Sequence, residues 1–390
     1  ITNANLTVKA DATMLKGLSG STPLAFAGKN VIDHSYQVEV LNKTGKLKIE
    51  MDVTGGNKSM KETTDILVNY PNSYETSVTK NIINSGKDLV YTVKPKGYSE
   101  VFEAKIMVSG LKVPNFTQYA ADLIDYPYGC LEQTTSSGFA QLYLDKILTL
   151  TPNENKLRLE NLNIAVNRIA KYQQPSGKFN YWDGNYYHAW SDIYAGNFLV
   201  EMVKLNLLPK NADIMKKWLD ATTAAANNWA LAEVSNDYTY ESETIAQAFR
   251  LFVLAKAGYP AKSAMNRFVS SSKSKNPLTW WLLAGSFQLS GYDSKAKEYI
   301  TKAESLQISN AQSSDYDTFG DQGRDMAIVV EVLSYFGSEK PKFEKYYDQM
   351  VETLNKMSWA STQTKGFAFI GAFKYFGKAV NANSKVEYTV

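Results

Sequence analysis

The chain of 390 residues is longer than one compact core usually holds, so we expect two domains or one domain with a large appendage. Its 42 basic and 39 acidic residues leave a formal net charge of +3, too small and too scattered to indicate nucleic acid or a membrane surface as a partner. The single cysteine excludes an internal disulfide and a zinc site of several thiolates, and the two separated histidines form no ligand cluster, so we expect no metal and no cofactor.

Residues 1–110 have the pattern of a β domain. Short segments rich in β-branched residues alternate roughly between apolar and polar positions, and clusters of Gly, Asn, Asp, Lys and Ser separate them. This spacing predicts an antiparallel β-sandwich. The stretch VTGGNKS at 53–59 predicts a β turn, because it lacks the spacing of a phosphate-binding loop. The predicted strands are NLTVKA (5–10), HSYQVEVLN (34–42), KLKIEMDV (46–53), DILVNY (65–70), DLVYTVKP (88–95) and EVFEAKIMVSG (100–110).

Residues 111–379 change to a helical period. In NLNIAVNRIAKY, for example, Leu162, Val166 and Ile169 fall on one helical face. Many helices of similar length with short loops predict an all-α domain in which paired helices close into an α/α toroid. A superhelical solenoid is the alternative, but no strict sequence repeat is visible. Further helices are predicted over 189–206, 211–228, 243–257, 260–272, 277–290, 293–305, 323–337, 341–357 and 363–376.

Residues 380–390 look extended again and end on KVEYTV. We expect one strand that returns to the β domain, so that the helical domain is an insertion in an α+β multidomain chain. The start at Ile1 and this strand-like end suggest a fragment of a longer protein. No membrane-spanning apolar run and no signal peptide are visible.

The stretch YPYGCLEQTTS, Tyr126 to Ser136, contains the only cysteine. One interpretation makes Cys130 a small buried hydrophobe at a helix start, the usual fate of a free cysteine. The other pairs Cys130 with Gln133, because residues three apart on a helical turn face the same way. A Cys130 thiolate could then attack the Gln133 carboxamide and expel ammonia, which leaves an internal thioester.

The residues around Cys130 favour that chemistry. A helix N-terminus stabilises a thiolate and the oxyanion of acyl transfer, and Gly129 lets the backbone turn sharply and approach closely. A thioester persists only where water is excluded. Tyr126 and Tyr128 are candidates for a hydrophobic cover, with ordinary aromatic packing as the alternative.

PYGCLEQ resembles the thioester signature of the alpha-2-macroglobulin and complement superfamily, Gly-Cys-x-Glu-Gln, and the Leu131 form after YPYG resembles the bacterial branch. Four later stretches are similar, in the same order, to the family's Gly-rich loop, Trp-x-(Thr/Asp)-x-Tyr helix, Arg-Asp-x-Ala helix start and Ser-Thr-Gln helix. These are QPSGKFNYWDG (174–184), WSDIYAGNFLVEM (190–202), FGDQGRDMAIVVEVL (319–333) and WASTQTKGFAFIGAFKYF (359–376).

The resemblance implies a macroglobulin-like or CUB-like β domain, a toroidal thioester domain, Cys130 as the thiol and Gln133 as the acyl donor. Glu132 belongs to the motif, and a first-turn carboxylate that complements the helix dipole is its expected role. Family members that prefer hydroxyl targets are thought to use a histidine far downstream. Here SNDYTYESET (235–244) offers Tyr238 and Tyr240 at that place, and His188 lies well before it, so we expect acyl transfer to amines.

By resemblance, the parent protein is a protease-trapping inhibitor and not an enzyme. An attacking endopeptidase cleaves a bait segment elsewhere in the chain, and the exposed thioester acylates one of its lysines once. Other domains of the full-length chain are further partners. The bacterial members imply a periplasmic or membrane-anchored lipoprotein that guards the cell envelope, as a defence during host colonisation, with the lipid anchor outside these residues.

Two other functions stay open. A relative with the same fold could lack the bond and act as a binding or scaffold module, although the presence of both Cys130 and Gln133 argues against this. An α/α-toroid glycoside hydrolase would need two carboxylates across a cleft, for which Asp183, Asp192 and Asp325 are available. Aspartates at such positions more often cap turns and helices.

Overall fold

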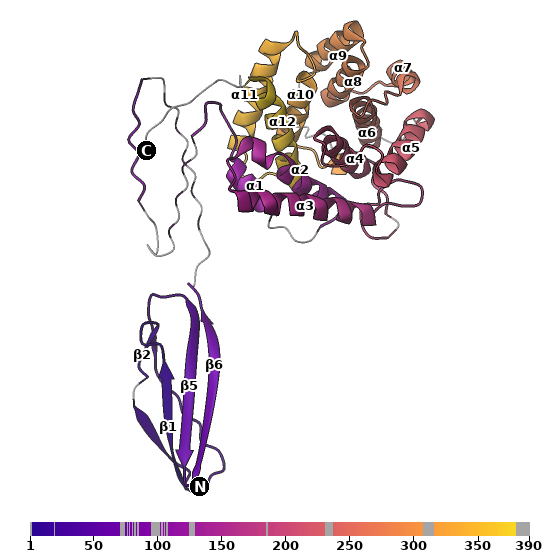
Figure 1. Cartoon of the computed structure of the whole chain (residues 1–390). Coiled ribbons are helices and arrows are strands. Elements are labelled where there is room, and N and C mark those ends of the chain that lie inside the picture. The colour runs from indigo at the N-terminus through magenta and orange to yellow at the C-terminus, as the bar shows by residue number, and fades with distance from the viewer. Residues whose placement is uncertain are drawn as a thin grey trace. The chain divides into compact units, whose positions relative to one another are not determined.

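The computed structural model describes residues 2–18, 20–70, 86–94, 108–124, 129–184, 186–230, 237–306 and 316–379, and single residues at 75, 77, 79, 81, 83, 102, 104 and 106. The chain divides into two compact units, Ile1–Glu103 and Ala104–Val390 (Figure 1). Among the described residues, no helix is long and apolar enough to cross a membrane.

The first unit contains an antiparallel sheet of four strands in the order β3-β1-β5-β6. The strands are β1 (Asn3–Ala10), β3 (Ser21–Ala25), β5 (Gly45–Gly55) and β6 (Lys58–Val68), and β2 (Leu15–Lys16) pairs separately with β4 (Glu39–Val40). β5 and β6 form a long hairpin whose last pair, Gly55 with Lys58, leaves Gly56 and Asn57 as a two-residue turn. Gly56 has φ +60°, as such tight hairpin turns require, and this turn confirms the prediction for 53–59.

The structure differs from the predicted strands in three places. The described residues 88–94 form no strand, because alternation alone does not supply a pairing partner. β3 was not predicted because Pro23 cannot donate to a ladder, and the fold tolerates it because β3 lies at an edge and pairs only with β1. Of 34–42, only Glu39–Val40 is a strand. The segment 100–110 lies largely outside the described residues, and the second layer of a sandwich stays a prediction.

The second unit is helical (Figure 1). Its helices are α1 (Phe116–Ile124), α2 (Leu131–Ile147), α3 (Pro152–Lys171), α4 (Ala189–Lys204), α5 (Asp213–Asn228), α6 (Asp237–Lys256), α7 (Lys262–Ser271), α8 (Pro277–Leu289), α9 (Asp293–Ser305), η2 (Tyr316–Thr318), α10 (Gln322–Leu333), α11 (Lys340–Lys356) and α12 (Thr362–Ala379). The predicted helices between 189 and 376 are all confirmed, most within a few residues of their bounds.

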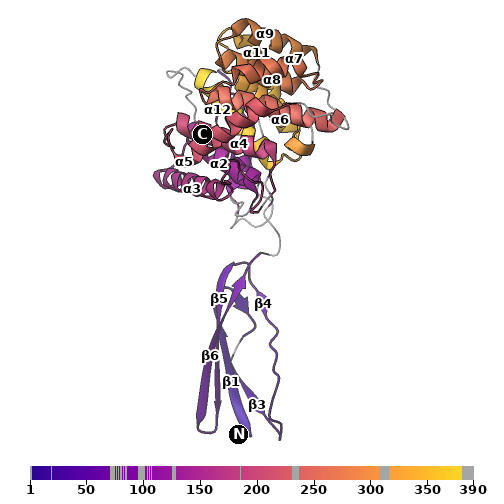
Figure 2. The ribbon, with the colours of Figure 1, turned by 90° about the vertical axis from the view of Figure 1, so that its right-hand side faces the viewer.

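The even-numbered helices contact one another in a closed series. α2 packs against α4, α4 against α6, α6 against α8, α8 against α10, and α10 against α12, which packs back against α2. The helices that follow them in the chain, such as α3, α9 and α11, pack on the outside of their predecessors. Figures 1 and 2 show the resulting group of helices from two sides.

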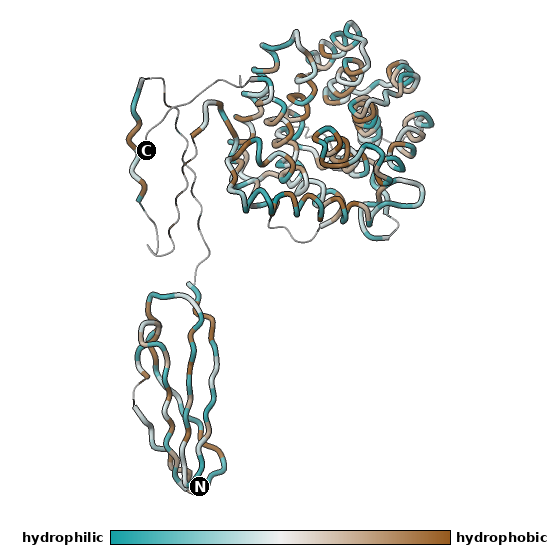
Figure 3. The backbone as a smooth tube through the Cα atoms, in the orientation of Figure 1, coloured by the Kyte–Doolittle hydropathy of each residue, from teal (hydrophilic) through white to brown (hydrophobic). Residues whose placement is uncertain are grey.

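Inner and outer helices differ in their sequences as this arrangement requires. On α4 every residue from Trp190 to Met202 is buried, so the helix is surrounded by protein. On α9 only Ala296, Tyr299, Ile300 and Ala303 are buried, which is one amphipathic stripe. In Figure 3 the hydrophobic colour is correspondingly dense on the helices in the middle of the unit. The predicted strand over 380–390 lies outside the described residues.

Candidate functional site

Cys130 occupies the N-cap position of α2, in an extended conformation with φ −65° and ψ 178°. Its side chain is 1% exposed and is a free thiol. The backbone N–H of Cys130 donates to Oε1 of Gln133 over 3.2 Å, and the backbone N–H of Gln133 points to the Cys130 side chain in return. This reciprocal capping box places the two predicted partners against each other.

Gly129 makes this close approach possible. A Cβ atom at this position would lie 2.7 Å from Cβ of Gln133 and 2.9 Å from its Oε1. Distances this short do not occur between real side chains, so any other residue would displace Gln133. The glycine of the motif is therefore explained by the space that the carboxamide occupies.

The Gly-rich stretch 174–184 lies against the start of α2. The backbone N–H of Leu131 donates to the carbonyl oxygen of Tyr181 over 2.9 Å. From the end of α3, the Tyr172 hydroxyl donates to the carbonyl oxygen of Gly129 over 2.9 Å. Two tyrosines thus hold the backbone of residues 129–131 at the start of α2.

Burial and hydrogen bonding act on the thiol in opposite directions. Burial raises the pKa of Cys130, because a thiolate is poorly solvated there, whereas the Tyr181 hydroxyl and the backbone N–H of Gln133 lower it. Burial also raises the pKa of Tyr181 well above its ordinary value, and the nearby Cys130 adds to this effect. Tyr181 therefore remains a neutral hydrogen-bond donor.

Asp192 holds the Gly-rich stretch in place. It is buried on the first turn of α4, where Oδ1 accepts the N–H of Phe179 over 2.9 Å and Oδ2 accepts the Tyr187 hydroxyl over 3.2 Å. Burial raises the pKa of Asp192 to about 6. The turn itself needs Gly177, whose φ is +91° and whose Cβ would fall 2.2 Å from the carbonyl oxygen of Lys217.

Glu132 does more than complement the helix dipole. Its carboxylate is buried and accepts the Ser136 hydroxyl over 2.7 Å. The Thr362 hydroxyl, on the first turn of α12, donates to the same carboxylate over 3.0 Å. Burial raises its pKa, and the two hydroxyls counteract that effect. Glu132 thereby joins the thiol motif to the Ser-Thr-Gln stretch at the other end of the helical unit.

The remaining motifs meet at Gln363. Its Oε1 accepts the indole N–H of Trp190 over 3.1 Å and a guanidinium N–H of Arg324 over 3.3 Å. Arg324 is fully buried, lies over the Trp190 ring at 4.7 Å and pairs with Asp325 at 2.6 Å. All the stretches that carried the resemblance therefore belong to one connected end of the helical unit.

The other predicted residues have different places. His188 is the N-cap of α4, and its Nδ1 accepts the backbone N–H of Ser191 over 3.3 Å. Tyr238 is exposed near the start of α6, and the Tyr240 hydroxyl accepts the backbone N–H of Lys273 over 2.6 Å. Tyr126 and Tyr128 lie outside the described residues, so their role as a cover stays a prediction.

From the sequence alone we assigned no role to Tyr172, Tyr181, Thr362 or Gln363. Three of the four stand inside the quoted motifs, and Tyr172 lies two residues before the first residue of one. Their position inside or beside the motifs could have marked them as candidate site residues. The specific contacts were not predictable, because each joins segments far apart in the chain.

Of the three carboxylates considered for a glycosidase, Asp183 is exposed and the other two already have hydrogen-bond or ion-pair partners. Asp192 accepts two hydrogen bonds and Asp325 pairs with Arg324.

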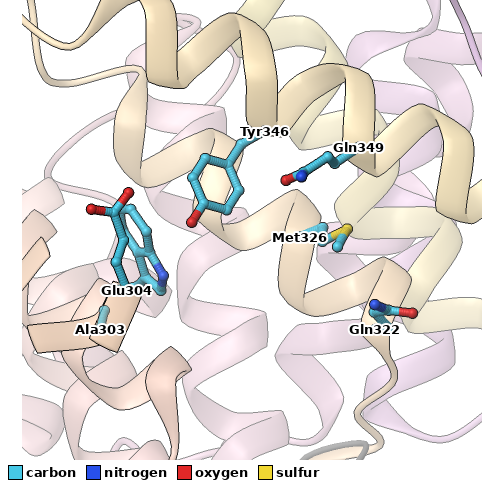
Figure 4. Close-up of a pocket in the computed structure, with 7 residues that line it drawn as sticks. Ala303, Glu304, Gln322, Met326, Tyr346 and Gln349 are labelled. Atoms are coloured by element: carbon cyan, nitrogen blue, oxygen red, sulfur yellow. The ribbon is translucent and has the colours of Figure 1, made fainter. Parts of the chain in front are cut away.

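A pocket of about 220 Å³ lies between α8, α9, α10 and α11, and Figure 4 shows Tyr346, Gln349 and Met326 around it. Its lining includes one carboxylate, Glu304, which pairs with Lys342 at 2.8 Å, whereas glycosidases use two. Across the part of the chain that the structure describes, no group of three or more His, Cys, Asp and Glu side chains could hold a metal ion.

Residues 101–226 match the family model described as the A-macroglobulin TED domain. The chain is 24% identical over 368 residues to an alpha-2-macroglobulin of Xylella fastidiosa, a match that covers 88% of this chain and 22% of the relative. Most of the chain is therefore similar to bacterial alpha-2-macroglobulins. An alpha-2-macroglobulin of Escherichia coli K12 is 23% identical over 287 residues, which cover 69% of this chain and 17% of that relative. The chain thus spans about a fifth of the length of the curated alpha-2-macroglobulins it matches.

Solved structures of alpha-2-macroglobulins share the fold. Salmonella alpha-2-macroglobulin reacted with methylamine matches with a TM-score of 0.65 and 21% identity, over 95% of this chain and 25% of that one. Native Escherichia coli alpha-2-macroglobulin, spanning domain MG7 to the C-terminus, matches with a TM-score of 0.64 and 19% identity, over 96% of this chain and 61% of that one.

Proposed function

We propose that this chain is the thioester-bearing part of a protease-trapping inhibitor of the alpha-2-macroglobulin type. The observation that carries the proposal is the capping box at the start of α2, which holds the Gln133 carboxamide against the buried Cys130. The carboxamide oxygen already accepts the backbone N–H of Cys130. This N–H would stabilise the negative charge that develops on the same oxygen when sulfur attacks.

The chemistry has two steps. Sulfur attacks the Gln133 carbonyl carbon, the C–N bond breaks, and ammonia leaves with the thiol proton. An amine later attacks the same carbon, so that a C–N bond forms, the C–S bond breaks, and the proton lost by the amine ends on sulfur. Each chain reacts once, so the protein is an inhibitor and not a catalyst.

We infer that lysine amines of a captured endopeptidase are the targets, after bait cleavage elsewhere in a longer chain. The relatives support this: one solved structure is of Escherichia coli alpha-2-macroglobulin activated by porcine elastase, and another is of the Salmonella protein reacted with methylamine. A bacterial cell envelope, through a periplasmic or lipid-anchored parent, is the location we propose.

We also propose the finer architecture. The closed series of inner helices supports an α/α toroid over 111–379, and the N-terminal sheet supports a macroglobulin-like sandwich over 1–110. Tyr126, Tyr128, Tyr238 and Tyr240 remain candidates for covering the bond, together with other domains of the full-length chain.

An intact-mass measurement before and after methylamine, with titration of the Cys130 thiol, tests the proposal. We expect a chain lighter by one ammonia, with no titratable thiol until methylamine adds. Gln133→Ala is the control, because it keeps the thiol and removes the acyl donor. A wild-type chain of full mass with a freely titrating thiol, and no adduct after methylamine, would instead support the scaffold alternative.

A further inference from the structure

We propose that Tyr172 is a positioning residue of the thioester chemistry: its hydroxyl holds the Gly129–Cys130 peptide so that the Cys130 N–H points at the carboxamide oxygen of Gln133. This inference rests on the proposed function and adds to it a residue that acts through one peptide group. The N–H of that peptide is the donor that would stabilise the charge on the Gln133 oxygen during acyl transfer.

The two ends of this peptide group have separate partners. Its N–H, which belongs to Cys130, donates to Oε1 of Gln133 over 3.2 Å. Its carbonyl oxygen, which belongs to Gly129, accepts the Tyr172 hydroxyl over 2.9 Å. A peptide group is planar and almost always trans, so its N–H and C=O point in opposite directions and turn together. A partner that fixes the carbonyl oxygen therefore also fixes the direction of the N–H.

Gly129 makes such an external hold necessary. Glycine has a wider choice of backbone conformations than any other residue. A Cβ atom at this position would restrict that choice, but it would lie 2.7 Å from Cβ of Gln133. The site thus excludes a side chain at the place where a restraint is needed, and the hydrogen bond from Tyr172 supplies the restraint instead.

The next peptide along the chain is held at both ends as well. The carbonyl oxygen of Cys130 accepts the N–H of Thr134 over 3.0 Å, as the first bond of α2. The N–H of Leu131 donates to the carbonyl oxygen of Tyr181 over 2.9 Å. Backbone groups therefore fix this second peptide, whereas the Gly129–Cys130 peptide depends on the side chain of Tyr172.

Tyr172 itself lies on a fixed part of the chain. It caps the end of α3, where its N–H donates to the carbonyl oxygen of Ile169 over 3.0 Å. Its own carbonyl oxygen accepts the N–H of Asn180 over 2.9 Å. α3 is bound to α2 in turn, since Arg158 donates to the carbonyl oxygen of Gln141 over 3.1 Å. The hydroxyl therefore starts from a position that is held relative to α2.

The state of the hydroxyl suits this role. Burial raises the pKa of Tyr172, and the nearby Cys130 adds to this effect, so the hydroxyl remains a neutral donor. A carbonyl group that accepts a hydrogen bond also polarises its peptide and makes the N–H a better donor. Both effects favour the bond from the Cys130 N–H to Gln133.

Tyr347 provides a matched control. Its hydroxyl, on α11, donates to the carbonyl oxygen of Lys112 over 2.7 Å, so it too holds a backbone carbonyl group through a phenol. Tyr347→Phe and Tyr172→Phe each remove one such bond and keep the ring. Only Tyr172→Phe removes a bond from the Gly129–Cys130 peptide.

The decisive measurement uses the single cysteine of the chain. Isotopic labelling of cysteine nitrogen gives one backbone amide signal in the NMR spectrum, that of Cys130. Any thioester is first opened with ammonia, which regenerates the Gln133 carboxamide. The amide proton shift is then recorded for wild type, Tyr172→Phe, Gln133→Ala and the double variant, with Tyr347→Phe as the control.

We expect Tyr172→Phe to move the Cys130 amide proton upfield, because its bond to Gln133 weakens, and Tyr347→Phe to leave it in place. The movement caused by Tyr172→Phe should be at least about twofold smaller in the Gln133→Ala background, where the acceptor is already gone. An equal movement in the two backgrounds would show that Tyr172 does not orient the N–H, and would overturn the proposal.

A second measurement follows the release of the Cys130 thiol by methylamine. We expect release to be about tenfold slower in Tyr172→Phe than in Tyr347→Phe, with similar thermal unfolding of the two variants. Equal rates would contradict a role of Tyr172 in the reaction. The two proposals can fail separately: a wild-type chain that never loses ammonia contradicts the thioester function, whereas the amide signal still decides whether Tyr172 orients the Cys130 N–H.

Discussion

Gly129 is the residue on which the geometry of the Cys130–Gln133 pair depends most directly. An added Cβ would meet both Cβ and Oε1 of Gln133. We expect Gly129→Ala to fold but to push the carboxamide away from sulfur, so that ammonia loss falls at least about tenfold. Intact mass after a fixed incubation measures this. Gly337→Ala is the control, because no atom lies within 4 Å of its added Cβ. Equal ammonia loss in the two variants would contradict the argument.

His188 illustrates a residue whose structural role is visible. Its Nδ1 caps α4 through Ser191, so His188→Ala should lower the free energy of unfolding by about 1 kcal/mol. The methylamine reaction should stay within about twofold of wild type, because direct transfer to an amine needs no relay. Reaction with glycerol should be slow in both proteins. A selective loss of glycerol reactivity in the variant would show that His188 does relay the acyl group.

At this scale the sequence predicted part of the site. The spacing of Cys130 and Gln133 and the resemblance together identified the pair that the structure brings into contact. Tyr181 was not identified, because the hydrogen bond between its carbonyl oxygen and the N–H of Leu131 depends on how the loop after α3 folds back onto α2. Local spacing carries no information about that contact.

Among the elements, the stretch between α3 and α4 depends on Asp192. The pKa of this buried carboxyl rises from 3.8 to about 6, so the folded state binds more protons than the unfolded state between these values. Stability therefore falls as pH rises from about 4 to about 6, and the ionised group costs about 3 kcal/mol above that range.

Asp192→Asn removes this titration and keeps an oxygen for the N–H of Phe179. We expect the difference in unfolding free energy between wild type and Asp192→Asn to vary with pH between about 4 and 6 and to be flat above. Urea unfolding at several pH values measures it. Parallel pH profiles for the two proteins would show that Asp192 is not the titrating group.

Helices were predicted better than strands, for physical reasons. A helix carries its period within its own sequence, so 277–290 and 293–305 were predicted almost as they occur. A strand needs a partner, which its own sequence does not reveal. The local sequence therefore does not show that 88–94 stays unpaired or that the edge strand β3 tolerates Pro23.

In the helical unit as a whole, buried charges join the inner helices. Lys256 of α6 pairs with Glu201 of α4 at 3.0 Å and with Glu331 of α10 at 2.6 Å. Lys374 of α12 also pairs with Glu201, at 2.7 Å, and the Tyr143 hydroxyl of α2 donates to it. This cluster was not predicted, because each residue looks like an ordinary charged position until the series of helices closes.

Lys256→Met should destabilise the fold strongly. The substitution leaves Glu201 with one lysine partner fewer and Glu331 buried without its ion pair. We expect the free energy of unfolding to fall by about 3–5 kcal/mol. Chemical denaturation measures the change. Lys216→Met, at an exposed position of the outer helix α5, should change stability by less than about 0.5 kcal/mol. A Lys256→Met protein as stable as this control would mean that the cluster does not hold the inner helices together.

The bond between Glu132 and Thr362 joins residues separated by 230 positions, at the two ends of the helical unit. A ribosome therefore releases Cys130 and Gln133 long before it has made α12, the helix that packs on α2. Until α12 has been synthesised and has docked on α2, Glu132 of the thiol motif lacks the hydrogen bond from Thr362. Under the proposed chemistry, the reactive bond is a product of completed folding, so an unfinished chain carries no group that could acylate its neighbours in the cell.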